Sequence, residues 1–265
     1  MINLSKSKKI NYPYPILIIE DFFEEHCLQK IIEEFPSFNK FIKFKKTMVN
    51  RRFLSNENPD FFSYINKNKT WEEFYKIVNS KEFYSKILNL LVDDSSKEYS
   101  KFSNLIYKEQ LNKKNKIMFN LNHYLKELTQ ITPRNSFFNF FREITKKITY
   151  RKKTKNSCFL RFDISSASNG YKRKPHKDSD GTIIAFLIYL EDQSKIGGTG
   201  GDFIINDSLF NKIKVLEPKK NKAVFFLSNN NSFHSVSEMK SANGWRKFIY
   251  GGFTSLDKLI WSKII

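Results

Sequence analysis

The first third of the chain spaces its apolar residues as amphipathic helices do. The apolar run at 16–19 predicts a short strand, and residues 22–35 keep roughly helical spacing until Pro36, a residue that helix interiors exclude. Two more helices are expected at WEEFYKIV and KEFYSKILNLLV, because Thr70 and Ser80 stand at their capping positions. The N-terminal part is therefore predicted to be mostly helical and to begin with one strand.

The segments around these helices carry weaker patterns. Residues 40–68 are polar and rich in Asn and Lys, which predicts a loop with little regular structure. Residues 93–155 are interpreted as an insertion, and the mixed apolar spacing at 117–148 is typical of a helical hairpin or of irregular packing. The basic run at 146–155 predicts a solvated linker, with contact to an anion as the alternative.

The pattern changes after residue 156. Short apolar or alternating runs, separated by Gly, Asn, Asp and Ser, predict strands at 158–164, 182–190, 202–205, 213–216, 223–227, 232–236 and 247–253. No helix-length pattern separates them, so they favour a sandwich or barrel over parallel βαβ units. We therefore expect a strand and helical support region with its insertion at residues 1–155, and an all-β core at 156–265.

Composition limits the class of protein. Of the 265 residues, 40% are hydrophobic and 28% are charged, which excludes a wholly disordered chain. No apolar run approaches the roughly 20 residues of a membrane helix, and MINLSKSKKINYPYP lacks the apolar stretch of a signal peptide. Two cysteines, Cys27 and Cys158, do not make a disulfide framework. We expect a cytoplasmic protein with both cysteines in its core.

The formal net charge is +19, from 46 Lys and Arg against 27 Asp and Glu. Such a charge suggests a nucleic acid as partner. However, arginine supplies only 8 of the 46 basic residues, and lysine, asparagine, isoleucine and phenylalanine share AT-rich codons. A lysine-covered surface therefore explains most of the charge, and nucleic acid is not the expected specific partner.

Two of the four histidines lie in contexts that suggest metal ligands. His176 and Asp178 are separated by one residue, and in an extended segment such residues project from the same face. His234 stands in another predicted strand, which antiparallel pairing could bring beside them. Two histidines and one carboxylate form the facial triad of non-haem Fe(II) oxygenases. Taken alone, the His-x-Asp pair is a weak signal that surface residues often produce by chance.

Arg246 opens the last apolar strand, after the Asn-Gly-Trp turn at 243–245. An arginine at that place can project into a barrel and offer its planar fork to a carboxylate. The alternative is an ordinary exposed arginine at the start of a strand. His26 and His123, in contrast, are interpreted as structural residues, and the glycines at 197–201 as a turn with close backbone approach.

A series of short motifs runs through the C-terminal part in a fixed order: FLRF at 159–162, GYKRKPHKD at 170–178, LIYLED at 187–192, GGDF at 200–203, VLEPKKNKAVFF at 215–226, HSV at 234–236 and GWR at 244–246. Together they resemble the 2-oxoglutarate/Fe(II)-dependent oxygenases, and within these the prolyl-hydroxylase-like branch. The opening PILIIEDFFEEHCLQKIIEEF at 15–35 resembles the first strand and helix of microbial members.

The resemblance implies a mainly β core, a double-stranded β-helix of the jelly-roll, cupin-like type, flanked by an α-helical N-terminal part. It implies that His176, Asp178 and His234 are the catalytic iron ligands. Arg246 and Tyr189 would bind the distal carboxylate of the co-substrate 2-oxoglutarate. With Fe(II), 2-oxoglutarate and O2, such an enzyme hydroxylates a substrate and releases succinate and CO2.

Some positions depart from the family pattern. Phe162 stands where several relatives have a tyrosine near the iron, so one hydrogen bond is absent. Gly252 stands where the nucleic-acid demethylase branch has a second arginine, which disfavours that branch. Asp178 is present where halogenases of this fold carry a small residue, so the intact triad favours hydroxylation.

The substrate is not decided by any residue of the sequence. A peptidyl proline or another side chain, a glycan or lipid precursor, and a free small molecule all remain open, as does the oligomeric state. Basic residues crowd the iron motif, which favours an anionic substrate, with lysine-rich composition as the competing explanation: Lys172, Arg173, Lys174 and Lys177. A different class of function is a non-catalytic β-barrel module that binds polyanions or nucleic acid and keeps the metal site as a relic.

Overall fold

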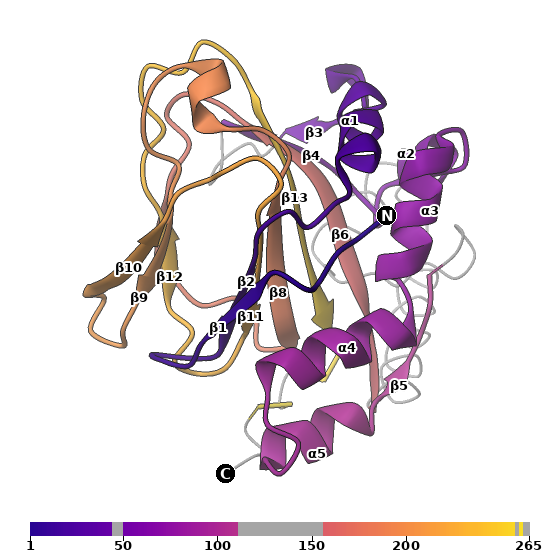
Figure 1. Cartoon of the computed structure of the whole chain (residues 1–265), viewed down its shortest axis with the longest axis vertical. Helices are drawn as coiled ribbons and strands as arrows, with labels where there is room; N and C mark the ends of the chain where they lie inside the picture. Colours follow the sequence, from indigo (N-terminus) through magenta and orange to yellow (C-terminus); the bar gives the residue numbers. More distant parts are fainter. Residues whose placement is uncertain (44–49, 111–155, 258–259, 262–265) are drawn as a thin grey trace, which may run out of the picture.

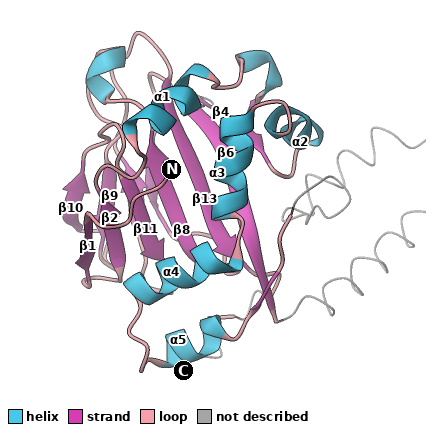
Figure 2. Cartoon of the chain, turned by 45° about the vertical axis from the view of Figure 1, so that its right-hand side comes forward, coloured by secondary structure: helices cyan, strands magenta, loops and turns pink. Residues whose placement is uncertain are grey.

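The computed structural model of the chain describes residues 1–43, 50–110, 156–257 and 260–261. Its strands form two sheets that face one another, and helices lie on the outer side of the larger sheet (Figure 1, Figure 2). His123, the helical hairpin expected at 117–148 and the basic run at 146–155 lie outside the described residues.

The larger sheet has the order β1-β2-β11-β8-β13-β6-β4-β3, with β5 pairing in parallel to β6. The smaller sheet has the order β10-β9-β12-β7, and its pairs are antiparallel. The strands are β1 (Ser7–Ile10), β2 (Ile16–Ile19), β3 (Ile42–Lys43), β4 (Arg51–Ser55), β5 (Ile106–Tyr107), β6 (Ser157–Ala167), β7 (Arg173–His176), β8 (Thr182–Tyr189), β9 (Phe203–Asn206), β10 (Lys212–Leu216), β11 (Ala223–Leu227), β12 (His234–Val236) and β13 (Arg246–Thr254).

The strands β11-β8-β13-β6 and β10-β9-β12-β7 together make the double-stranded β-helix, a jelly roll of two facing four-stranded halves. The fold class expected from the sequence is therefore confirmed. Two N-terminal strands, β2 and β4, extend the larger half at its two edges by pairing with β11 and β6. The N-terminal residues thus continue the sheet of the C-terminal core.

The two faces of the larger sheet bury different sets of side chains. Because side chains alternate along a strand, Arg246, Phe248 and Tyr250 project from one face of β13, while Ile249 and Phe253 project from the other. Phe248 belongs to the apolar cluster between the two sheets. Ile249 and Phe253 belong to the larger cluster beneath the helices. The inner face of the sheet is therefore the one that can carry a site.

Helices cover the outer face through aromatic contacts. The ring centroid of Phe83 in α4 lies 6.1 Å from that of Phe225 in β11, and the centroid of Phe74 in α3 lies 5.9 Å from that of Phe162 in β6. In Figure 2, α3 and α4 lie in front of this sheet. The helices are α1 (Glu25–Glu33), α2 (Pro59–Ile65), α3 (Lys69–Val78), α4 (Lys81–Leu91) and α5 (Lys97–Ser103).

The expected cap of α4 is present, since the Ser80 side chain accepts a hydrogen bond of 3.1 Å from the backbone N–H of Phe83. We predict that Ser80→Ala lowers the free energy of unfolding by about 1 kcal/mol, because a first-turn N–H loses its partner. Ser85→Ala, the same change within the same helix, is the control and should be neutral or slightly stabilising. Urea denaturation measures both, and equal values for the two variants would contradict the capping role.

Two predictions about the N-terminal half were wrong. The loop expected at 40–68 contains β4 and α2. The sequence of β4 looks polar because it contains Arg51. In the structure Arg51 is nevertheless buried, because it forms an ion pair with Asp163 of β6, which lies far away in the sequence. Thr70 does not cap α3, because the helix begins after Asn68 and the Thr70 hydroxyl donates to Glu34 instead.

Other expectations about the N-terminal half and the cysteines agree with the structure. The strand at 16–19 is present as β2, and α1 ends before Pro36. Cys27 and Cys158 are both buried and free. Among the described residues, no helix combines the length and the apolar character needed to cross a membrane.

Candidate metal centre

The two histidines singled out by the sequence meet at neighbouring strand ends. His176 ends β7 and His234 begins β12, and the antiparallel register places them opposite one another. Their ring centroids are 4.4 Å apart. Asp178 follows two residues after His176, and the three side chains offer ligand atoms that all lie within 4.8 Å of one another. The pairing expected from the His-x-Asp spacing is therefore present.

Backbone carbonyls fix which nitrogen of each imidazole is available. Nδ1 of His176 lies 2.8 Å from the carbonyl oxygen of Lys174, and Nδ1 of His234 lies 3.0 Å from that of Ser232. A carbonyl oxygen only accepts hydrogen bonds, so Nδ1 of each ring carries the proton. The lone pair is then left on Nε2, which is the arrangement that metal-binding histidines use.

The carboxylate of Asp178 has one oxygen held and one oxygen open. The hydroxyl of Tyr250 donates to Oδ1 at 3.0 Å. Oδ2 is buried, accepts no hydrogen bond within the described part of the chain, and lies 4.0 Å from Nε2 of His234. A buried carboxylate oxygen without a partner is costly unless a cation occupies the site. Two imidazole nitrogens and this oxygen therefore fit a metal ion, and as a donor set they suit Fe(II).

Burial sets the charge of one ligand. Desolvation, together with the neighbouring His234 and Arg173, lowers the pKa of His176 to about 4. The imidazole of His176 is therefore neutral at neutral pH. Metal ligation requires this neutral form.

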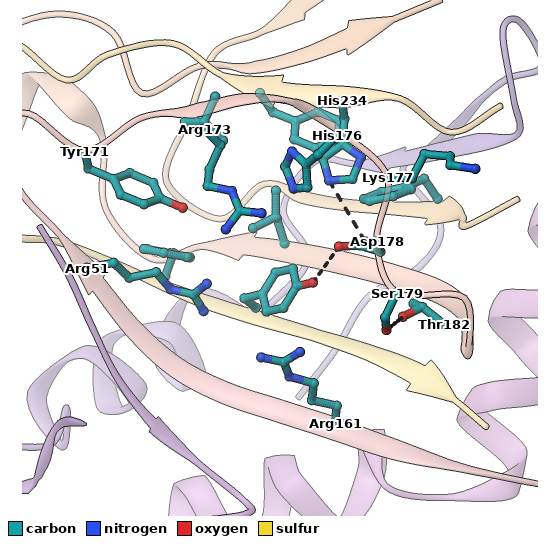
Figure 3. Close-up of a pocket in the computed structure, with 16 residues that line it drawn as sticks. Arg51, Arg161, Tyr171, Arg173, His176, Lys177, Asp178, Ser179, Thr182 and His234 are labelled. Carbon is teal, nitrogen blue, oxygen red and sulfur yellow. Dashed lines mark hydrogen bonds and ion pairs between the residues drawn. The ribbon is translucent and has the colours of Figure 1, made fainter. Parts of the chain in front are cut away.

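The triad forms part of the wall of a pocket with a volume of about 230 Å³. Its apolar lining is Leu187, Phe203, Phe226, Val236 and Phe248, and its polar lining is Arg51, Arg161, Tyr171, Arg173, His176, Lys177, Asp178, Ser179, Thr182, His234 and Tyr250. Figure 3 shows the two imidazoles on one side and the labelled arginines below and beside them. The pocket can thus admit a small molecule or a side chain next to the triad.

Arg246 and Tyr189, the two other residues singled out by the sequence, lie beside one another outside the lining of this pocket. The guanidinium of Arg246 is 5.5 Å from the centre of the Tyr189 ring. It donates to Oε1 of Gln193 at 2.7 Å and to the carbonyl of Gly201 at 3.0 Å, and its Nε has no hydrogen-bond partner in the described structure. Arg246 thus reaches from β13 toward the smaller sheet, as an arginine projecting into the barrel would.

Burial shifts the ionisation of this pair. It raises the pKa of Tyr189 to about 12, so the phenol stays protonated and able to donate. Burial also lowers the pKa of Arg246, while the nearby Tyr189, Tyr171 and Asp202 act in the opposite direction. Arginine remains cationic under ordinary conditions because its reference pKa is so high.

Sequence reasoning did not single out Arg51, Arg161 and Tyr250, which all line the pocket. Period-two alternation could have found Tyr250, because it lies four residues after Arg246 on the same face of a predicted strand. The same alternation puts Arg161 and Asp163 on one face of β6. Arg51 had no signal, because its segment was interpreted as a loop.

The remaining glycine and histidine predictions can be compared with the structure directly. Gly200 has φ of +79°, and a Cβ there would lie 2.0 Å from the carbonyl oxygen of Glu238, so the turn with close backbone approach is confirmed. Glu24, His26 and Cys27 form a second group of nearby ligand atoms. There the Glu24 carboxylate pairs with the Met1 amine at 2.6 Å, and both Glu24 and His26 are exposed.

Comparison with known proteins adds a family and several structural neighbours. The model of the 2OG-Fe(II) oxygenase superfamily matches residues 162–254. No curated protein matches the chain. A prolyl-4-hydroxylase of Pseudomonas putida is 21% identical over 36% of this chain and 49% of its own, with a TM-score of 0.30. This chain therefore spans about half the length of that neighbour.

Two other neighbours align over most of this chain. A prolyl 4-hydroxylase of Phytophthora capsici is 13% identical over 91% of this chain and 58% of its own, with a TM-score of 0.49. A prolyl hydroxylase of Trichoplax adhaerens, solved with a hypoxia inducible factor peptide, is 11% identical over 92% and 84%, with a TM-score of 0.45.

The matched residues include the whole triad and the strands that carry it. The double-stranded β-helix, the converging His, Asp and His side chains and the family match agree with one another. Residues 162–254 therefore match the 2OG-Fe(II) oxygenase superfamily, whose enzymes work with Fe(II) and 2-oxoglutarate.

Proposed function

We propose that this enzyme is a dioxygenase that hydroxylates a substrate and releases succinate and CO2. His176, Asp178 and His234 hold the iron. The observation that carries the proposal is the geometry of the triad: each imidazole is oriented by a backbone carbonyl, and the buried Oδ2 of Asp178 has no hydrogen-bond partner among the described residues. Three protein ligands leave positions open for co-substrate and oxygen.

The chemistry is divided between the bound groups and the chain. Iron and 2-oxoglutarate, when bound, would supply oxidation by O2: 2-oxoglutarate loses CO2 and takes up one oxygen atom of O2 as succinate, and the other oxygen atom enters a C–H bond of the substrate. The chain holds the ligands in place and surrounds the substrate with the apolar side chains of Phe203, Phe226 and Phe248. The presence of Asp178, which completes the triad, supports hydroxylation as the reaction.

We propose that Arg246 binds the distal carboxylate of 2-oxoglutarate, with Tyr189 as a second donor. Both side chains are buried, and the phenol remains protonated. A guanidinium buried with an unpartnered Nε can offer a fork to a carboxylate. Nη1 of Arg246 donates to Oε1 of Gln193, so a ligand at this position would compete with Gln193 for that donor.

Arg246→Ala should weaken 2-oxoglutarate binding about tenfold or more, because a buried charge-assisted hydrogen bond is lost. The measurement is a 2-oxoglutarate titration of the full chain loaded with Fe(II) under anaerobic conditions, with succinate formation in air as a second readout. Arg52→Ala is the control, because Arg52 stacks on Trp245 and does not line the pocket. If Arg246→Ala bound 2-oxoglutarate with unchanged affinity, Arg246 could not be the residue that binds its distal carboxylate.

Tyr250 is proposed as a positioning residue for the iron ligand Asp178. Tyr250→Phe removes the 3.0 Å hydrogen bond to Oδ1 and keeps the ring. We expect Fe(II) affinity to fall about tenfold, as it does when partners of metal ligands are removed. A competition titration against a chelator measures it, with Tyr12→Phe, at an exposed tyrosine, as the control. Full affinity in Tyr250→Phe would show that Asp178 needs no support.

We also propose a division of labour along the chain, with residues 1–155 as the supporting region and 156–265 as the oxygenase core. The packing of α4 on β11 supports this proposal, because Phe83 covers the side of the sheet that faces away from the triad. The substrate contacts then come from the inner face.

A further inference from the structure

Three arginines line the pocket: two on the wall across from the two histidines, on the larger sheet, and one on β7 beside them. The three are Arg51 of β4, Arg161 of β6 and Arg173 of β7. Figure 3 shows the guanidinium of Arg173 pointing down from β7 and that of Arg161 pointing up from β6, into the space below the histidine pair. The chain has only 8 arginines. A lysine-rich composition therefore does not explain why this pocket gathers three.

Asp163 is the carboxylate that two of these guanidiniums share. Its Oδ2 accepts from Nη2 of Arg51 at 3.3 Å and from Nη2 of Arg161 at 3.1 Å. One carboxylate therefore serves two cations. Arg51 is buried and also donates to Ser165. The Arg161 side chain is 35% exposed and its Nε has no hydrogen-bond partner in the described structure.

Tyr250 sets the spacing between this wall and the triad. Its hydroxyl contacts Asp178, while the guanidiniums of Arg51 and Arg161 lie 4.9 and 5.4 Å from the centre of its ring. A group bound by Arg161 is therefore about one aromatic ring away from the metal ligands. Arg173 stands on the strand that ends in His176 and approaches the same space from the other sheet.

We propose that Arg161 and Arg173 form a subsite that binds an anionic group of the substrate, a carboxylate or a phosphate. This inference rests on the proposed function and names the substrate class for it. Guanidinium forks match both anions in geometry and charge. The subsite is separate from Arg246, which lies outside the pocket lining, so substrate and co-substrate each have their own arginine.

The test uses the full chain loaded with Zn(II), which is redox-inert, and saturated with 2-oxoglutarate. Calorimetry measures the binding of two probes of similar shape, methylphosphonate and acetate. The variants are Arg161→Gln and Arg173→Gln. The control is Lys172→Gln, which removes the same charge beside Arg173 from an exposed side chain outside the pocket lining.

We expect the wild-type protein to bind at least one probe. Tighter binding of methylphosphonate would indicate a phosphorylated substrate, and tighter binding of acetate would indicate a carboxylic acid. Each arginine variant should weaken binding of the tighter probe about tenfold, as loss of a charged hydrogen bond does, while Lys172→Gln and the 2-oxoglutarate affinities should stay near wild type. Arg173 lies on an edge strand, so its variant keeps the test valid if Arg161→Gln fails to fold.

Three results would overturn the subsite. The first is that neither probe binds to the wild-type protein. The second is that Lys172→Gln weakens probe binding as much as the arginine variants do. The third is that the arginine variants lose their affinity for 2-oxoglutarate while Arg246→Ala keeps it. Failure of the proposed function looks different, because the wild-type chain would then bind neither the metal nor 2-oxoglutarate.

Discussion

Replacing His176 with alanine is expected to abolish succinate formation and to remove tight binding of Fe(II). The structure leaves Nε2 of this ring free to ligate, and its ring lies 4.4 Å from that of His234. Without His176, only one nitrogen and one carboxylate oxygen remain, and two ligands do not define the facial geometry that non-haem iron uses. Metal content after dialysis and succinate formed from 2-oxoglutarate measure the two effects separately.

The matched control is His26→Ala, which changes an exposed histidine on α1. It should keep both the metal and the turnover. His234→Ala should behave as His176→Ala does, because the two rings occupy equivalent places in the triad. A His176→Ala protein that folds, retains its iron and forms succinate at the wild-type rate would refute the metal assignment.

Asp163→Ala is expected to destabilise the fold by about 3–5 kcal/mol, which is typical when one partner of a buried ion pair is removed. The carboxylate is 1% exposed and holds Arg51 and Arg161 together across β4 and β6. Its loss removes a charge partner of Arg51, which is 5% exposed. The free energy of unfolding in urea gives the value directly.

Asp94→Ala provides the comparison, because the same change at this exposed aspartate should alter the free energy of unfolding by no more than about 0.5 kcal/mol. If Asp163→Ala lowered the free energy of unfolding as little as Asp94→Ala does, the carboxylate of Asp163 would contribute nothing to the stability of the pocket wall. The inward-facing arginines would then need another explanation for their burial.

The β core could be predicted from the sequence because its signals are local. The runs at 182–190 and 223–227 correspond to β8 and β11, and the alternation rule placed His176 and Asp178 on one face. The facing histidine could be anticipated because antiparallel pairing has few registers, and the observed one sets His234 opposite His176.

The cluster of arginines in the pocket could not be predicted, because it depends on contacts between segments that are far apart in the sequence. Arg51 and Asp163 are separated by 112 residues, and neither segment taken alone shows why a charged residue should be buried. The start of α3 was misplaced for a similar reason. Thr70 has the right chemistry for a cap, but its hydroxyl bonds to Glu34 of another element. Tertiary contacts overrode local preference in both cases.

The position of β7 at the edge of the smaller sheet has a consequence for local dynamics. Among the strands that the structure describes, β7 pairs only with β12, and short edge strands are among the first parts of a fold to open. His176 ends β7 and His234 begins β12, so a metal ion bound by both residues would hold the two strands together. Amide hydrogens of β7 should then exchange more slowly as metal is added, by the linkage between ligand binding and opening. The concentration of metal would thereby determine how often β7, which lines the pocket, opens.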